Sequence, residues 1–304
     1  MPWTEITDYD ASHGWTAGND PAMRAEQCCR ALERGEILYF ARPPFEFSAS
    51  DREFLLSQRT TDSRLHKNIS YRPQEDLLRG FSDGKENEKR VHEIMREYSR
   101  EVTRFVSALL APYGRGMTMD FASFRPLEEE GRDLPLHKKN DLLHVDAFPS
   151  RPTHGGRILR VFTNVNPAKG RVWVVGERFP ELARRYARTA GLDAIAARGT
   201  GRKMKHLLHA AGLPVPDRSA YDDFMLHFHD YLKENRGFQA DTRNERLEFP
   251  PLSTWLVFTD GVPHAALSGQ FAMEQTYIVG AEALVEPEQA PIRVLERLCG
   301  RKLA

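Results

Sequence analysis

The stretch Asp141-Leu-Leu-His144-Val-Asp146-Ala-Phe-Pro149 places an imidazole and a carboxylate two residues apart within an apolar, strand-like run. On a strand, residues i and i+2 point to the same face, so His144 and Asp146 can reach one metal ion together. The pair is weak evidence by itself, because the 11 histidines of the chain would produce roughly one such pair by chance. A third ligand is needed to define a site.

His264 offers that ligand. It follows the run Thr254-Trp-Leu-Val-Phe-Thr-Asp260-Gly-Val-Pro, in which an apolar strand ends in an Asp-Gly turn. Two histidines and one carboxylate, with one histidine far downstream, match the facial triad of non-haem Fe(II) oxygenases, which leaves open positions for cosubstrate and dioxygen. We therefore predict that the iron ligands and catalytic residues are His144, Asp146 and His264.

Oxygenases of this kind commonly hold a dicarboxylic cosubstrate with a basic residue near the iron. Arg160 lies in the strand-forming run Arg157-Ile-Leu-Arg160-Val-Phe-Thr-Asn164, which an Asn-Pro pair closes. Its planar guanidinium can bind a carboxylate through two parallel hydrogen bonds. We predict that Arg160 and Asn164 bind the cosubstrate; the alternative is that Arg157 and Arg160 are surface residues of a strand.

The composition bounds the class of protein. A chain of 304 residues with 40% hydrophobic residues can bury a large core, which excludes a disordered or fibrous protein. Lys plus Arg and Asp plus Glu number 43 each, so no bulk charge favours nucleic acid. We expect neither a signal peptide nor a membrane span. Three cysteines, including the adjacent Cys28 and Cys29, resemble no zinc motif or disulfide framework and fit a reducing cytoplasm.

Periodicity predicts the order of the elements. Helical spacing and capping residues favour helices at 20–35, 50–56, 86–110 and 292–299, and alternation favours strands at 37–40, 117–126, 252–259 and 271–280. Residues 65–73 show neither period and are predicted to form a loop. We expect a mostly helical N-terminal region (1–115), a core (116–285) with a helical insertion at about 178–245, and a C-terminal helix (286–304).

Two polar segments are candidates for binding. Lys138, Lys139 and Asn140 precede the metal ligands and could contact an acidic substrate, or they could belong to a solvated charge run. The basic segment 184–205 suits contact with phosphates or an anionic membrane, although it could also be a solvated face. We expect four histidines of the insertion to be structural or surface residues. His227 and His229 are two residues apart, and such positions on a helix face different sides. His206 and His209 could share a face, but no acidic third ligand has a clear place beside them.

Four blocks of the sequence resemble the Kdo hydroxylase family of Gram-negative bacteria, and the resemblance extends from about residue 37 to 280. The blocks are 65–73, 123–132, 138–149 and 157–167. Members of this family are Fe(II)- and 2-oxoglutarate-dependent dioxygenases. They hydroxylate C3 of 3-deoxy-D-manno-oct-2-ulosonic acid (Kdo) in the inner core of lipopolysaccharide and so produce Ko.

The resemblance implies an α+β fold with a double-stranded β-helix core of the jelly-roll or cupin type. Many members of the wider superfamily have a basic residue on the strand after the distal histidine, but this chain has Glu274 and Gln275 there. The resemblance thus favours Arg160 as the 2-oxoglutarate anchor, with Arg125 as its rival. Arg125 could also bind the sugar acid together with Lys138, Lys139 and Asn140.

The implied reaction consumes O2 and 2-oxoglutarate at Fe(II), releases succinate and CO2, and acts on Kdo-lipid A. Because that substrate lies in a bilayer, we expect a cytoplasmic enzyme in peripheral contact with the inner membrane. The sequence leaves the oligomeric state open, a homo-oligomer included. The alternatives are an oxygenase for another acidic sugar, lipid or protein side chain, and a cupin-like metal-binding module without turnover, which would form no succinate.

Overall fold

The computed structural model describes the chain except for residues 1–2, 11, 17, 19, 59–67 and 198–216. Its strands are β1 (Trp3–Glu5), β2 (Tyr9–Asp10), β3 (Gly14–Trp15), β4 (Ile37–Phe40), β5 (Ile69–Arg72), β6 (Leu77–Arg79), β7 (Met117–Arg125), β8 (Arg157–Asn164), β9 (Arg171–Val175), β10 (Glu245–Phe249), β11 (Thr254–Phe258), β12 (His264–Ser268) and β13 (Ala272–Val279). The helices are α1 (Pro21–Glu33), α2 (Ala49–Ser57), α3 (Lys85–Leu109), α4 (Phe179–Tyr186), α5 (Leu192–Ala197), α7 (Ala220–Glu234), α8 (Arg236–Asp241) and α9 (Pro291–Cys299).

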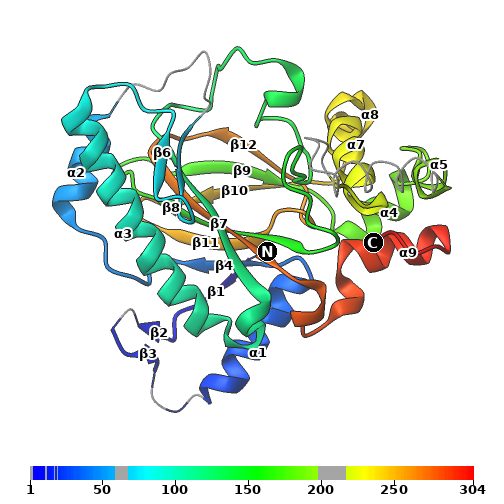
Figure 1. Cartoon of the computed structure of the whole chain (residues 1–304), viewed down its shortest axis with the longest axis horizontal. Coiled ribbons are helices and arrows are strands. Elements are labelled where there is room, and N and C mark those ends of the chain that lie inside the picture. The colour runs from blue at the N-terminus through cyan, green and yellow to red at the C-terminus, as the bar shows by residue number, and fades with distance from the viewer. Residues whose placement is uncertain (1–2, 11, 17, 19, 59–67, 198–216) are drawn as a thin grey trace.

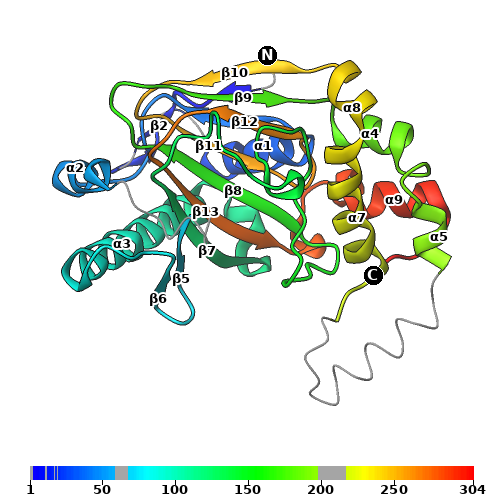
Figure 2. The same cartoon turned by 90° about the horizontal axis from the view of Figure 1, so that it is seen from above.

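Two β-sheets form the centre of the molecule (Figure 1). The larger has the order β1-β4-β11-β8-β13-β7-β5-β6, and the smaller has the order β10-β9-β12. Figure 2 shows the smaller sheet as a layer above the strands of the larger one. Two facing, mainly antiparallel sheets are the jelly-roll architecture that was predicted, and the added helices make the fold α+β.

Aromatic side chains fill the space between the sheets. Phe249 of the smaller sheet stacks on Trp255 of the larger with ring centroids 3.9 Å apart, and Trp173 meets Trp255 edge to face at 5.6 Å. Both tryptophans are fully buried. Such rings bury large apolar areas, so they stabilise the two-sheet arrangement that supports the site.

Helices α1 and α3 cover the outer face of the larger sheet. Their apolar side chains form one continuous cluster with those of the sheet. Along α3 the buried positions recur every three or four residues, as the sequence predicts for an amphipathic helix; they are Val91, Ile94, Met95, Tyr98, Ser99, Val102, Phe105, Val106 and Leu109. Helix α1 begins where predicted, since the Asp20 carboxylate accepts a hydrogen bond from the Ala22 amide.

Two local predictions were wrong. Helix α2 is capped by Ser48 rather than Ser50, because the Ser48 hydroxyl accepts from the Asp51 amide. Residues 69–72 of the predicted loop form β5, which pairs with β6 and β7, while 65–67 lie outside the described residues. The strand predicted at 37–40 is present as β4, and it pairs in the larger sheet with β1, for which no prediction was made. The short strands β1 and β5 depend on tertiary pairing, which local periodicity does not reveal.

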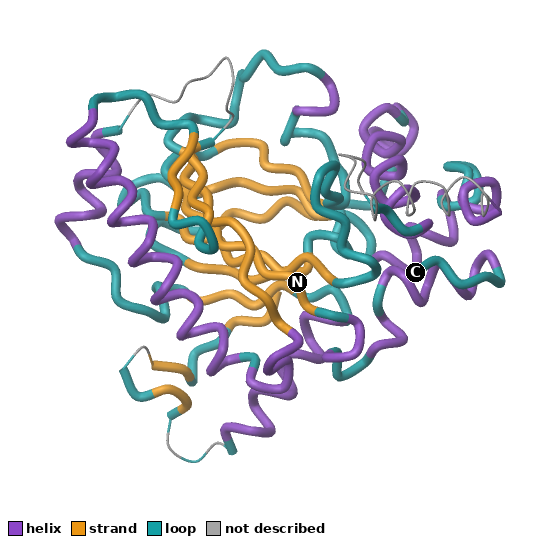
Figure 3. Tube along the Cα trace, in the orientation of Figure 1, coloured by secondary structure: helices purple, strands orange, loops and turns teal. Residues whose placement is uncertain are grey.

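Helices α4, α5, α7 and α8 lie between β9 and β10 in the sequence, and α9 packs against α4 and α5. Figure 3 shows these helices grouped at one end of the strands, opposite α2. This arrangement brings α7 beside the metal ligands. Within the described part of the chain, no helix combines the length and the apolar composition that a membrane crossing requires.

Candidate metal centre

Backbone pairing brings the two predicted histidine ligands together. His144 and His264 exchange both amide hydrogen bonds, at 3.2 and 3.0 Å, in a single antiparallel bridge at the start of β12. The amide of Asp146 donates to the carbonyl of Thr259 at 2.9 Å. The stretch around His144 is therefore an extended segment and not the strand that was predicted, because its pairing stops after one bridge.

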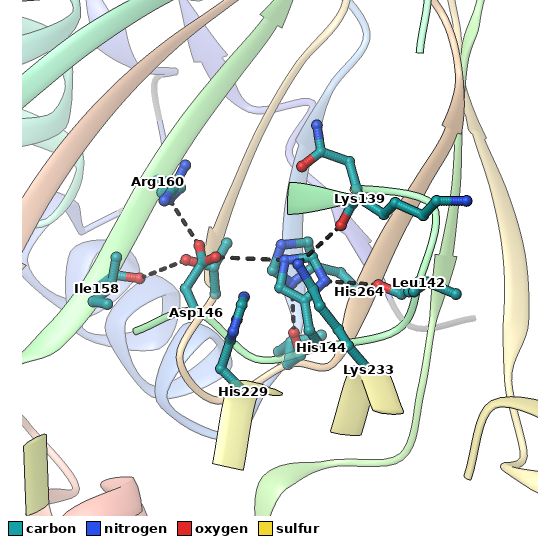
Figure 4. Close-up of polar contacts among 12 residues, drawn as sticks. Lys139, Leu142, His144, Asp146, Ile158, Arg160, His229, Lys233 and His264 are labelled. Carbon is teal, nitrogen blue, oxygen red and sulfur yellow. Dashed lines mark hydrogen bonds and ion pairs between the residues drawn. The ribbon is translucent and has the colours of Figure 1, made fainter. Parts of the chain in front are cut away.

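The ligand atoms of His144, Asp146 and His264 all lie within 4.8 Å of one another, and no other such cluster occurs among the described residues. Figure 4 shows the two imidazoles and the carboxylate turned toward one another. Nδ1 of His144 lies 2.7 Å from the Leu142 carbonyl, and Nδ1 of His264 lies 2.9 Å from the Val262 carbonyl. These contacts place the N–H on Nδ1, so Nε2 of each ring is free to bind a metal.

Burial and neighbouring charges set the protonation of the three groups. Burial lowers the pKa of both His144 and His264, so the imidazoles are neutral. Burial acts to raise the pKa of Asp146, but the positive charge of Arg160 outweighs it and the pKa is lowered. Two neutral imidazoles and one carboxylate on one side of a cavity fit an Fe(II) ion of the facial-triad type.

The triad borders a cavity of about 170 Å³. Its lining residues are Arg125, His137, Asn140, His144, Asp146, Arg160, Phe162, Arg171, Trp173, His229, Lys233, His264 and Ala266. Four of them carry a positive charge at neutral pH: Arg125, Arg160, Arg171 and Lys233. A small, cation-rich cavity beside a metal centre is suited to anionic ligands.

Glu274 of β13 joins two of the arginines. It accepts from Nε and Nη2 of Arg125 at 3.1 and 2.7 Å, and it pairs with Arg160 through its other oxygen. Burial acts to raise the pKa of Glu274, but Arg160 and Arg125 lower it, so the group is ionised. Glu274 lies on the strand that carries the basic anchor in many members of the wider superfamily. In this chain the acidic residue pairs with two arginines, which come from other strands.

Glu129 contacts three lining residues of the cavity. One of its oxygens lies 3.1 Å from Nη2 of Arg171 and 3.4 Å from Nη1 of Arg125, and the other accepts from the Asn140 amide at 2.9 Å. Arg171 also donates to the Gly269 carbonyl at 2.8 Å. Burial lowers the pKa of Arg171, although the negative charge of Glu129 acts to raise it. The guanidinium groups are thus held in place before any ligand binds.

The structure separates the other predicted binding residues. Arg125, Arg160 and Asn140 line the cavity, whereas Lys138 and Lys139 do not. Asn164 also lies outside the cavity lining. Its amide donates to the carbonyls of Lys169 and Pro250 at 2.9 and 3.1 Å, which anchors the turn after β8. The position of Asn164 therefore supports a structural role instead of the predicted binding of cosubstrate.

Seven lining residues of the cavity were not predicted from the sequence: His137, Phe162, Arg171, Trp173, His229, Lys233 and Ala266. His229 was expected to be structural or on the surface; it lines the cavity and its ring meets that of His144 edge to face at 5.1 Å. The spacing of His229 and Lys233, four apart on α7, indicates a shared helix face. His227 is exposed, and His206 and His209 lie outside the described residues.

Comparisons with known proteins agree with this geometry. The sequence model of the 3-deoxy-D-manno-oct-2-ulosonic acid (Kdo) hydroxylase family matches residues 15–302. The chain is similar to the crystal structure of the Kdo hydroxylase KdoO, a non-haem Fe(II) α-ketoglutarate-dependent dioxygenase, in complex with α-ketoglutarate and Fe(III). The identity is 32%, the TM-score is 0.83, and the match covers 100% of this chain and 98% of that chain.

The apo structure of KdoO matches with 32% identity and a TM-score of 0.84 over 100% of this chain and 97% of that chain. The KdoO complex with succinate and Fe(III) matches with the same identity and coverage and a TM-score of 0.83. Among functionally curated proteins, no sequence matches the chain.

Proposed function

Because the chain belongs to the Kdo hydroxylase family, we propose that it is an Fe(II)- and 2-oxoglutarate-dependent dioxygenase that hydroxylates C3 of Kdo in Kdo-lipid A. The products are Ko, succinate and CO2. The observation that carries the proposal is the buried cluster of His144, Asp146 and His264 in a cavity that also holds three arginines.

The protein's part in the reaction is to orient ligands and to position charge. The backbone carbonyls of Leu142 and Val262 hold the two imidazoles with Nε2 free. His144, Asp146 and His264 would hold the iron, which would supply the activation of dioxygen that is coupled to decarboxylation of 2-oxoglutarate. The small, cation-rich cavity keeps the reacting carbon in one orientation and limits side reactions.

Arg160 is the main candidate to anchor 2-oxoglutarate. It lines the cavity, and its Nε and Nη1 pair with Asp146 and Glu274, while Nη2 makes no hydrogen bond to any described residue. Arg125 and Arg171 add positive charge from the neighbouring wall. We propose that Arg160 donates to a terminal carboxylate of 2-oxoglutarate and that Arg125 and Asn140 contribute to the binding of the acidic ligands.

The direct test is to incubate the purified protein with Kdo-lipid A, Fe(II), 2-oxoglutarate and air. Mass spectrometry should show the addition of one oxygen to the Kdo unit, with one succinate formed for each product molecule. Omission of 2-oxoglutarate and the variant His144→Ala serve as controls. Succinate formed without oxidised Kdo would indicate another substrate, and no succinate at all would indicate a binding module.

We also propose that the enzyme works in the cytoplasm, in peripheral contact with the inner membrane, because its substrate is anchored in a bilayer. Three arginines of the basic segment are already paired: Arg184 with Glu181, Arg185 with Glu177 and Arg188 with Asp193. The proposal therefore depends on the remaining cations, which lie outside the described residues; they are Arg198, Arg202, Lys203 and Lys205. Cations of this kind each contribute about 1 kcal/mol against an anionic leaflet.

A further inference from the structure

Lys233 is a buried cation on the α7 side of the cavity, with only 4% of its surface exposed. Its Nζ donates to the carbonyls of His137 and Lys139 at 3.0 and 2.8 Å. Figure 4 shows it beside the metal ligands and near His229, which comes from the same helix. An ammonium group has three N–H donors, so these two carbonyls leave one donor unused.

Lys233 differs from the three arginines of the cavity in its partners. Each arginine has a carboxylate within ion-pair distance; the pairs are Arg125 with Glu274, Arg160 with Asp146, and Arg171 with Glu129. Lys233 has no carboxylate within 4.0 Å among the described residues. Asp146, Asp230 and Asp141 act on it only through longer-range electrostatic attraction.

The charge balance of the site follows from these pairs. Among the described residues that line the cavity, three guanidinium groups are paired with three carboxylates, which leaves Lys233 as the cation without an ion-pair partner. A divalent metal and a dicarboxylate cosubstrate add equal and opposite charges, so their binding adds no net negative charge. Arg132 approaches Glu129 at 3.6 Å from outside the cavity lining and only adds positive charge. A buried cation that lacks an ion-pair partner is costly and favours the binding of an anion.

We propose that Lys233 binds the carboxylate of the sugar acid substrate and thereby positions the carbon that is hydroxylated. This inference rests on the proposed function. In a 3-deoxy-2-ulosonic acid the carboxyl carbon is C1, only two bonds from C3. The group that anchors this carboxylate must therefore lie next to the metal ligands, where Lys233 is found. Pairing with Lys233 also distinguishes an acidic sugar from a neutral one.

Burial lowers the pKa of Lys233 to about 8, so the ammonium remains protonated at neutral pH. A purely structural role is the competing explanation, because the two hydrogen bonds of Lys233 also tie the short helix η2 (Leu136–Lys138) to α7. The test must therefore separate a loss of charge recognition from a displaced loop.

The experiment compares detergent-dispersed Kdo-lipid A with a derivative whose Kdo carboxyl is converted to a carboxamide. Binding to the Co(II)- and 2-oxoglutarate-loaded protein is followed by tryptophan fluorescence, since Trp173 lines the cavity. The variant Lys233→Gln keeps donors for the two carbonyls but has no charge. Arg236→Gln removes an exposed cation from the adjacent helix α8 and is the matched control.

Wild type and Arg236→Gln should prefer the acid over the carboxamide by about tenfold or more, the size expected for a charge-assisted hydrogen bond. Lys233→Gln should lose most of this preference and bind the carboxamide like the wild type. Equal weakening of both ligands, or an unchanged preference, would overturn the proposal. If Lys233→Gln does not fold, Lys233→Met replaces it, and absence of a preference in the wild type refutes the proposal without any variant.

An assay of Kdo-lipid A hydroxylation by the wild type distinguishes failure of the proposed role of Lys233 from failure of the proposed function. If the wild type forms Ko but Lys233→Gln retains the preference for the acid, only the role of Lys233 fails. If the wild type neither binds nor oxidises Kdo-lipid A, the proposed function fails with it.

Discussion

Arg160 holds one oxygen of a metal ligand: its Nε lies 2.9 Å from Oδ2 of Asp146. The other oxygen, Oδ1, lies 3.7 Å from Nε2 of His144 and faces the centre of the triad. The same guanidinium pairs with Glu274. Arg160 therefore connects the metal centre with the wall of the cavity, and a change at this residue should affect both.

Each residue of the triad should be needed for metal binding. His144→Ala, Asp146→Ala and His264→Ala each delete one of the three ligands that the described residues offer, so we expect loss of Co(II) binding in calorimetry and loss of turnover. The circular dichroism spectrum should stay that of a folded protein. Stoichiometric metal binding with full activity at ordinary iron levels in any one variant would refute the triad.

Arg160→Ala should raise the 2-oxoglutarate concentration for half-maximal succinate formation by roughly tenfold to a hundredfold, because a charge-assisted pair is lost. The dependence on Kdo-lipid A should change much less. Arg160→Lys is the informative control, since it keeps a charge near Asp146 but lacks the planar fork. An unchanged 2-oxoglutarate dependence in Arg160→Ala, with a large change in Arg125→Ala, would move the anchor to Arg125.

Glu274→Gln should destabilise the protein, because two buried arginines would lose their shared counter-charge. Only 3% of Glu274 is exposed. Removal of one partner from a buried ion pair costs about 3–5 kcal/mol, so we expect a loss of about 3 kcal/mol in the free energy of unfolding measured with urea. Glu97→Gln, which breaks the exposed pair with Arg100, should cost less than about 1 kcal/mol. Equal effects of the two substitutions would contradict the buried network.

The titration of Lys233 should appear in the pH dependence of stability. Burial lowers its pKa from 10.5 to about 8, so between these values the unfolded chain holds this proton and the folded protein does not. The free energy of unfolding therefore rises with pH through this window, and the penalty for the buried charge is fully present below about pH 8.

Lys233→Met removes this titration. The free energy of unfolding of the wild type, relative to the variant, should increase from about pH 8 to about pH 10.5. The upper bound is about 3 kcal/mol, and solvent screening makes the change smaller. Urea unfolding of both proteins across this range measures the difference. A difference that does not vary with pH would show that the pKa of Lys233 is not lowered.

The proposed membrane contact predicts salt-sensitive flotation with anionic vesicles. Exposed charges are screened within about 8 Å at physiological ionic strength, so the bound fraction should fall at high salt. Changing the four cations of the segment to serine should reduce binding at low salt; they are Arg198, Arg202, Lys203 and Lys205. If wild type and variant float equally, or neither floats, this segment is an ordinary solvated face.

The sequence by itself determined the features that depend on short-range pattern. The period of α3, the aspartate cap of α1 and the apolar run of β11 are properties of neighbouring residues, and each appears as predicted. The cluster of candidate metal ligands could also be predicted, because few residue types bind iron and His144-x-Asp146 with a distant histidine is a restricted combination.

Only the tertiary structure decided which charges surround those ligands. Glu274 meets Arg160 because β13 pairs with β8. Lys233 reaches the cavity because α7 lies at the end of the sheets where His144, Asp146 and His264 are found (Figure 2). Nothing near these residues in the sequence distinguishes them from surface charges. Burial and ion pairing depend on contacts between distant segments, and a local pattern contains no information about such contacts.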